Sequence, residues 1–236
     1  MISNFSQRVG AEFLGTAGLL MAVVGSGIMG EQLAGGNVAI ALLANTIATG
    51  ASLVALILTF GPISGAHFNP VVSLADASQG GITWREATMY ILTQVAGAML
   101  GVAIAHVMFA RPVYEFSSHE RSGFSQAFSE FIATFGLMSV IWGCSRQHPK
   151  AVAFAVGAYI TGAYWFTAST SFANPAVTIA RTVTNTFAGI RPADAPAFIG
   201  AQMLGAAAST ALFRWLVPAL PKTAEQVVVP HEQSRL

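Results

Sequence analysis

The chain has 236 residues, of which 54% are hydrophobic and 9% are charged, and its formal net charge is +1. Soluble domains carry roughly 25% charged residues, so this composition excludes an ordinary water-soluble surface, and the near-neutral charge excludes nucleic acid as an expected partner. Cys144 is the only cysteine, which excludes an internal disulfide and a thiolate-clustered metal site. We therefore expect a protein of the lipid bilayer without a metal or other cofactor.

Six apolar segments follow one another along the chain, each near the length of about 20 helical residues that crosses a hydrocarbon core. We predict membrane spans at Val9–Met29, Val38–Phe60, Thr88–Phe109, Phe124–Trp142, Ala151–Thr170 and Pro196–Val217. Two further segments, Asn69–Ser78 and Asn174–Phe187, begin with Asn-Pro and are too short or too polar to cross. Such segments are typical of re-entrant half-helices. The sequence thus predicts an all-α membrane protein with six transmembrane helices and two half-helices.

The two halves of the chain resemble each other. Residues 11–20 resemble 129–138, with a glutamate at the same place, and residues 68–75 resemble 173–180, with Asn-Pro at the same place. Because each half holds three spans, the second copy must enter the membrane from the opposite side, as an inverted repeat. We predict one domain over 1–236, with repeats at about 8–110 and 122–217 and a polar tail at 218–236.

Lysine and arginine in the short loops predict the orientation, because cytoplasmic loops are enriched in both. With the N-terminus inside, the cytoplasmic side holds Arg8, Arg85, Arg146, Lys150, Arg214, Lys222 and Arg235, and the outer side holds Arg111, Arg121 and Arg191. We therefore expect both termini, and with them the tail, to be cytoplasmic.

The two Asn-Pro pairs carry the main functional signal. Proline fits the first helical turn, because its missing N–H would be unpaired there. If the half-helices meet near the midplane, their positive dipole ends converge, and Asn69 and Asn174 direct amide N–H groups into a lumen. Cations and protons then meet a barrier, whereas a neutral solute accepts hydrogen bonds. One Asn-Pro is also a common turn start, so the duplication at matching points is what indicates a pore.

These motifs resemble the aquaporin and aquaglyceroporin family, the major intrinsic proteins. Residues 64–72 resemble its first re-entrant loop, 173–177 resemble its second, and the glutamate-bearing segments resemble its first and fourth helices. The resemblance covers about residues 8–217. It implies a six-helix bundle with one pore per subunit, a homotetramer, and a passive channel for small neutral solutes, not an enzyme. The implied pore motifs are Asn69, Pro70 and Val71 in one half and Asn174, Pro175 and Ala176 in the other.

Glu12 and Glu130 lie inside predicted spans, where an ionisable side chain is costly and usually functional. Equivalent glutamates of the family accept hydrogen bonds from the loop backbone, so the resemblance implies that they support the loops. A proton relay is the alternative. His67 precedes the first Asn-Pro and either supports its loop or lines the pore with its carbonyl; without companion ligands it predicts no metal site.

The resemblance also implies a second constriction on the outer side. Its four positions, counted from the two asparagines, are Thr49, Gly162, Ser171 and Val177, with Phe172 in place of Ser171 if the loop is shifted by one residue. Water-selective members carry an aromatic residue, a histidine and an arginine at the first, second and fourth positions. We therefore predict a wide, weakly polar constriction without arginine.

Arg181 leaves two alternatives open. One helical turn advances about 5.4 Å, so Arg181, four residues after Val177, could reach back to the constriction. It could instead pair with Asp76, which holds the equivalent place in the first half.

Val71 and Val177 together give a pattern similar to a small group of bacterial channels associated with arsenic-resistance operons, the aquaporin S type. This resemblance implies arsenite and methylated arsenicals as substrates beside glycerol, urea and water, and a location in the bacterial inner membrane. An ordinary glycerol or water facilitator is the nearest alternative. A secondary transporter also uses inverted repeats, but it would need an intramembrane coupling residue that the sequence does not place.

Overall fold

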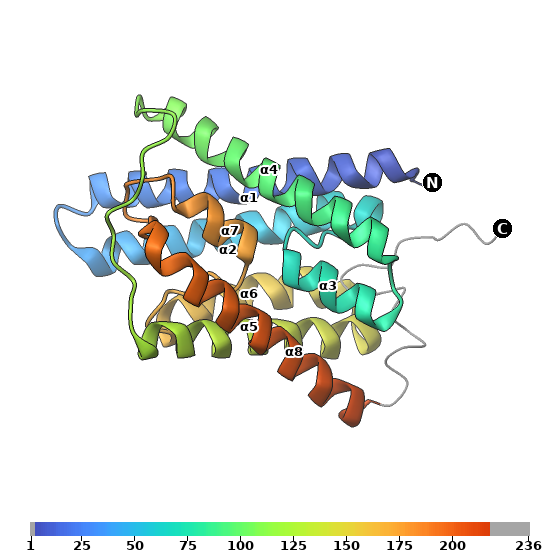
Figure 1. Cartoon of the computed structure of the whole chain (residues 1–236). Coiled ribbons are helices and arrows are strands. Elements are labelled where there is room, and N and C mark those ends of the chain that lie inside the picture. The colour runs from blue at the N-terminus through green and yellow to red at the C-terminus, as the bar shows by residue number, and fades with distance from the viewer. Residues whose placement is uncertain (1–2, 218–236) are drawn as a thin grey trace.

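Six long helices and two short ones form a bundle in the computed structural model, which describes residues 3–217 except the side chains of 146 and 147. The helices are α1 (Phe5–Leu33), α2 (Val38–Ser64), α3 (Pro70–Gln79), α4 (Trp84–Met108), α5 (Phe124–Gln147), α6 (Val152–Phe166), α7 (Pro175–Arg181) and α8 (Ala195–Leu216), with 3-10 turns η1 (Pro149–Ala151) and η2 (Pro192–Asp194). The short helix α3 lies toward the end of the bundle that holds the N-terminus, and α7 lies toward the opposite end (Figure 1). These are called the α3 end and the α7 end below. The predicted tail 218–236 lies outside the described residues.

Side chains that satisfy free backbone groups fix several helix ends. Asn4 and Thr83 begin α1 and α4 with capping boxes, and the Asn37 side chain accepts from the first N–H groups of α2. Gly65 and Gly80 end α2 and α3 with φ angles of 87° and 83°, a left-handed conformation that glycine adopts without strain. Gly65 therefore ends α2 directly before the loop that carries the first Asn-Pro.

Five of the long helices are long and apolar enough to cross a membrane. The sixth, α6, has 15 residues, so the predicted span Ala151–Thr170 is too long at its C-terminal end. The chain turns extended at Thr167, where φ is −111° and ψ is 139°. The second half-helix also ends early, at Arg181 instead of Phe187, because the chain after it pairs with the loop between α4 and α5, where the Ser117 N–H donates to the Thr182 carbonyl at 2.9 Å.

The two halves of the bundle are assembled in the same way. The first half packs α1 against α4, and the second packs α5 against α8, while α2 and α6 join the halves. Small residues let the backbones approach closely. A Cβ added at Gly97 of α4 would lie 2.3 Å from the Phe13 carbonyl oxygen, and one added at Gly205 of α8 would lie 2.4 Å from that of Phe131.

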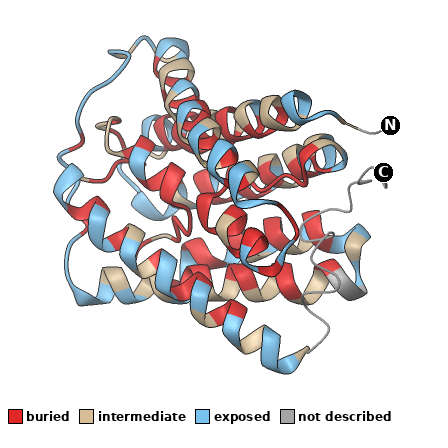
Figure 2. Ribbon diagram, turned by 45° about the vertical axis from the view of Figure 1, so that its right-hand side comes forward, coloured by how far each residue is buried: buried red, intermediate tan, exposed pale blue. Residues whose placement is uncertain are grey.

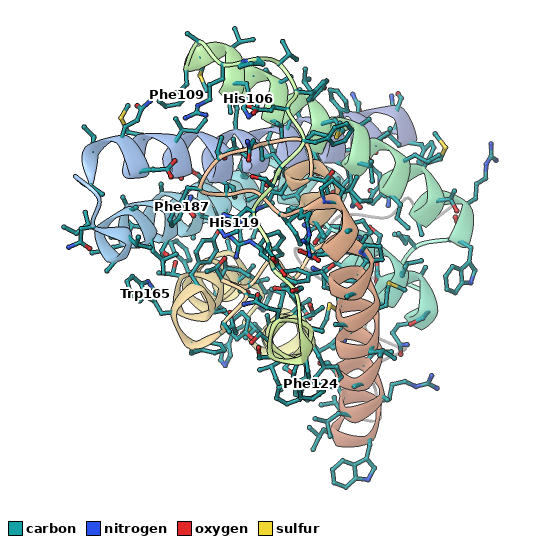
Figure 3. The ribbon with its side chains drawn as sticks, turned by 60° about the vertical axis from the view of Figure 1, so that its left-hand side comes forward. His106, Phe109, His119, Phe124, Trp165 and Phe187 are labelled. Carbon is teal, nitrogen blue, oxygen red and sulfur yellow. The ribbon has the colours of Figure 1, made fainter. Side chains whose placement is uncertain are left out.

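Apolar side chains cover the outside of the bundle and polar ones are enclosed within it. Figure 2 shows exposed residues on the outer faces of the helices and buried residues on the inner faces. Large exposed side chains include Leu14, Val38, Ile47, Leu58, Leu92, Phe154 and Leu204. Trp165 and Phe124 point away from the bundle (Figure 3). Glutamate, glutamine and asparagine side chains are buried inside beside an apolar core, and the large apolar side chains on the outside suit a lipid surrounding.

Candidate solute pore

The two Asn-Pro motifs meet inside the bundle. The Nδ2 atom of Asn69 donates to the Ala173 carbonyl at 2.8 Å, and that of Asn174 donates to the Phe68 carbonyl at the same distance of 2.8 Å. Both asparagines are buried and line one cavity. Each Nδ2 atom carries two hydrogens and donates one of them to a carbonyl of the opposite loop. One N–H of each amide is therefore left for a molecule in the cavity.

The residues after each asparagine start the half-helices without lining the cavity. The Asn69 Oδ1 atom accepts from the Val71 N–H at 3.1 Å, and the Asn174 Oδ1 atom accepts from the Ala176 N–H at 3.0 Å. Pro70 occupies the first turn of α3, as Pro175 does in α7. Val71 and Ala176 are buried in the core, so the four predicted motif residues beside the asparagines serve to cap and pack the half-helices.

Glu12 holds the first re-entrant loop. Its carboxylate accepts from the His67 N–H at 3.0 Å and from the Phe68 N–H at 2.7 Å. Gln94 of α4 was not foreseen as a site residue: its Nε2 atom donates to Glu12 at 2.8 Å and to the Ser73 hydroxyl at 3.0 Å. The available signal was a glutamine in the middle of an apolar span, where a polar side chain needs a partner.

Glu130 holds the second loop with matching bonds, except that Glu12 also accepts from the Ser64 hydroxyl at 2.6 Å. It accepts from the N–H groups of Phe172 and Ala173, both at 2.8 Å. Gln202 of α8, also missed, donates to Glu130 at 2.6 Å and to the Thr178 hydroxyl at 2.9 Å. Neither glutamate lines the cavity. This geometry favours the loop-supporting role over a proton relay.

Both loops carry strained backbone. Ala66, Phe68, Ser171 and Ala173 have φ angles of 48° or 49°, in the left-handed region that costs a non-glycine residue free energy. In each loop these two left-handed residues are separated by one residue with an ordinary φ angle. The glutamate carboxylates bond the N–H groups that this conformation turns inward, and so stabilise a loop that the sequence alone would not favour.

His67 lies at the cavity and supports its loop through its ring. Its Nδ1 atom is 3.0 Å from the Ser73 hydroxyl, and its Nε2 atom is 3.4 Å from a carboxylate oxygen of Asp76. The ring edge meets Tyr90 with centroids 5.3 Å apart. Asp76 therefore pairs with His67, and the alternative ion pair between Asp76 and Arg181 is wrong.

Four of the predicted constriction residues line the cavity, and their role as a constriction stays a prediction. Thr49, Ser171, Phe172 and Val177 all line the cavity, so both members of the Ser171 or Phe172 alternative are present.

The prediction for Gly162 is wrong. This residue is exposed on the outer face of α6, and the cavity is lined instead by Val156, Ile160 and Tyr164, which follow one another at helical spacing. The Tyr164 hydroxyl lies 3.4 Å from that of Thr49. Counting back from Asn174 crosses the non-helical loop after Phe166 and loses the helical phase.

Arg181 reaches the cavity, as the first of its two alternatives has it, so the cavity is not free of arginine. The side chain is buried, and its guanidinium carbon lies 3.4 Å from the centre of the Phe172 ring. Its Nε atom donates to the Ala188 carbonyl. Residue 177 is valine, but the cation it lacks is supplied from one turn further along α7, against the aromatic wall.

Arg121 lies behind Phe172 and was not foreseen. It comes from the loop between α4 and α5, with its guanidinium carbon 5.1 Å from the Phe172 ring centre. Its Nε atom donates to the Gly189 carbonyl at 2.8 Å and its Nη1 atom to that of Ser169 at 3.2 Å. Burial lowers the pKa of Arg121 to about 10, so it keeps its charge at neutral pH. Arg121 lies in a loop, where no sequence periodicity predicts that its side chain is buried behind Phe172.

The cavity itself is narrow and mostly aliphatic. Its volume is about 60 Å³, room for only a few water molecules. Its apolar walls come from four of the long helices and the start of α3: Leu19, Val23, Leu53, Ile57, Val72, Leu137, Ile141, Val156 and Ile160. The few polar groups face this lining from the two loops and from the α7 end.

Comparison with known proteins agrees with this geometry. The model of the family described as "MIP: Major intrinsic protein" matches residues 2–151 and 144–235. The aquaglyceroporin AqpS of Rhizobium meliloti (strain 1021) is 54% identical over 219 residues, which cover 92% of this chain and 94% of the relative. Aquaporin NIP1-3 of Oryza sativa subsp. japonica is 34% identical over 183 residues, 75% of this chain and 63% of the relative.

A solved structure shares the fold. The X-ray structure of the aquaglyceroporin from Plasmodium falciparum superposes with a TM-score of 0.71 at 20% identity, covering 92% of this chain and 99% of the other. The helical bundle with paired half-helices, the matching family model and the similar relatives lead to one conclusion: the chain belongs to the major intrinsic protein family of membrane channels.

Proposed function

We propose that this protein is a passive channel for small uncharged solutes, with arsenite and methylated arsenicals among them beside glycerol, urea and water. The observation that carries the proposal is the pair of amides, Asn69 and Asn174, which face one narrow apolar cavity at the starts of α3 and α7. Uncharged hydroxyl groups can accept their N–H bonds, while an ion would lose its hydration among aliphatic walls.

Arsenical passage rests on the width of the constriction. Valine at 177 and threonine at 49 are smaller than an arginine and an aromatic residue, and Arg181 lies against Phe172. A side chain held flat on the wall leaves more room than one that crosses the lumen. Arsenite in its neutral trihydroxide form is a small polyol mimic, and its methylated forms need the additional room. The similarity to aquaglyceroporin AqpS over nearly the whole chain supports an aquaglyceroporin-type substrate range.

Tyr164 and Arg181 favour a second candidate, an ordinary glycerol or water facilitator. Tyr164, which the sequence analysis did not foresee, brings an aromatic ring to the cavity, and Arg181, by one of its two alternatives, brings a cation. A narrower cavity would then exclude the methylated arsenicals and pass only the smaller solutes.

We place the protein in the bacterial inner membrane as a homotetramer with one pore per subunit, its α3 end facing the cytoplasm and its α7 end outside. The positive-inside rule supports this orientation. The α3 end holds the described residues Arg8, Arg85, Lys150 and Arg214, and the α7 end holds the exposed or partly exposed Arg111 and Arg191. Both termini would then be cytoplasmic.

Flux into proteoliposomes tests the proposal. Purified protein should pass water, glycerol, arsenite and methylarsenite down their gradients, with no change when proton or sodium gradients are collapsed. Val177→Arg should lower the passage of glycerol and the methylated arsenical by about tenfold, a barrier change of about 1.4 kcal/mol, and lower water passage less. Equal fluxes of the large solutes in both proteins would refute the widened constriction, and accumulation that depends on an ion gradient would indicate a secondary transporter.

A further inference from the structure

Arg181 is a buried cation without a carboxylate partner among the described residues. Its side chain is 2% exposed, and it takes part in none of the ion pairs found in residues 3–217. Within the described residues, Nε is the guanidinium nitrogen that makes a hydrogen bond, which it donates to the Ala188 carbonyl. The two terminal nitrogens make no hydrogen bond within the described chain, and the residue lines the cavity. Up to four N–H donors are therefore available to a molecule there.

The charges around Arg181 add up to a positive end of the cavity. Arg121 stands near the same Phe172 ring and donates to backbone carbonyls, which do not neutralise it. Two carboxylates bond to this region, and both are already engaged. Glu130 accepts from two loop N–H groups and from Gln202, and Asp194 accepts from the main-chain N–H of Arg121 and from Arg191. Neither carboxylate forms an ion pair with the guanidinium group of Arg121 or Arg181 among the described residues.

Ser171 gives a second, independent sign of a ligand. Its hydroxyl oxygen is buried, makes no hydrogen bond in the structure, and belongs to a residue that lines the same cavity. A buried hydroxyl without a partner costs free energy, so it is usually bonded by a group absent from the protein chain. Thr49 and Tyr164, the other polar groups here, lie within 3.4 Å of each other.

We propose that Arg181 and Ser171 bind a tetrahedral oxyanion of the phosphate or arsenate class, which enters from the α7 end and blocks the channel. This inference rests on the proposed function. A planar guanidinium presents parallel N–H groups that match two oxygens of such an anion, and the serine hydroxyl donates to a third. The anion stays there because the next stretch of cavity has walls such as Leu53, Ile57 and Ile160, where a charge would lose its solvation. A neutral solute such as the trihydroxide form of arsenite makes weaker hydrogen bonds with the same groups and passes.

The test is glycerol flux into proteoliposomes, measured by stopped-flow light scattering, with potassium phosphate or potassium chloride outside at equal ionic strength. Phosphate should lower the wild-type glycerol permeability several-fold and saturably. Arg181→Gln should abolish the effect, Ser171→Ala should weaken it, and Arg181→Lys should retain part of it because the charge remains without the planar fork. Arg111→Gln, which changes an arginine just after α4, should be inhibited like the wild type.

Thermal unfolding of the detergent-solubilised wild type with inorganic phosphate provides a readout that does not depend on flux. A ligand of the folded state should raise Tm with phosphate concentration, and Ser171→Ala should reduce that rise even if Arg181→Gln fails to fold. Glycerol permeability that is equal in phosphate and chloride, or an equal inhibition of Arg181→Gln, would overturn the inference while leaving the channel function intact. An absence of glycerol flux in chloride would instead contradict the proposed function, and the Tm measurement would then decide on the site.

Discussion

The two re-entrant loops share a scaffold and differ in the half-helices that come after them. Each loop has an asparagine that bonds a carbonyl of the other loop, a glutamate that bonds two loop N–H groups, and a glutamine that bonds the glutamate. Seven residues after the asparagine the halves part: Asp76 meets His67 in the first, and Arg181 stacks on Phe172 in the second. The shared bonds hold the loops. Of the differing pair, Arg181 lines the cavity, whereas Asp76 lies behind His67, which lines it.

The largest effect is expected when the shared scaffold is broken. Glu130→Ala would leave the N–H groups of Phe172 and Ala173, and one of the two N–H groups of the Gln202 amide, buried without an acceptor. Each such group costs about 1–3 kcal/mol, so the variant should lose about 3 kcal/mol or more of folding stability. Thermal unfolding in detergent measures this loss.

Glu12→Ala should cost a similar amount, because the first loop repeats these bonds. Glu120→Ala is the control, since that side chain is 62% exposed and should change stability little. A large loss in only one of the two loop variants would show that the halves are not held alike.

A smaller effect tests whether the helix pairs of the two halves pack equally closely. Gly205→Ala would put a Cβ 2.4 Å from the Phe131 carbonyl oxygen and force α5 and α8 apart. We expect a loss of roughly 1–3 kcal/mol, read from the same unfolding assay. Gly200→Ala in the same helix meets nothing within 4 Å and should be neutral or slightly stabilising. If both alanines behave alike, close packing at Gly205 is not needed.

The smallest effect is expected at the α7 end of the cavity, where the test is which residue of α6 lines the wall. Tyr164→Ala should change the ratio of glycerol to water permeability several-fold, because a cavity wall is removed. Gly162→Ala should leave that ratio unchanged, since the residue is exposed outside the bundle. A change with Gly162→Ala and none with Tyr164→Ala would restore the assignment made from sequence spacing.

Sequence reasoning succeeded where the determinants are local. Asn-Pro specifies both a cap and a first turn, so the half-helix starts at Asn69 and Asn174 could be placed to the residue. The glutamates inside apolar spans were marked as functional because no water is present there to satisfy them, and the family resemblance assigned them to the loops.

It failed where a position depends on a loop or on a rotamer. Gly162 was counted across a non-helical loop, whose length does not preserve helical phase. Arg181 shares a helix face with Val177 by its spacing of four, but the ring of Phe172 decides where the guanidinium lies. Arg121 comes from a long connection whose path no local pattern fixes.

The exchanged amide bonds between the loops also bear on how such a chain can arise. Asn69 is completed by a carbonyl that belongs to the other half, and Asn174 by one that belongs to the first. An ancestral gene encoding a single half would have kept the bond from each asparagine to its own half-helix but would have lacked the carbonyl that accepts from the amide. It would have needed a second copy inserted in the opposite orientation, so that a twofold axis relating the two copies passed between their amides.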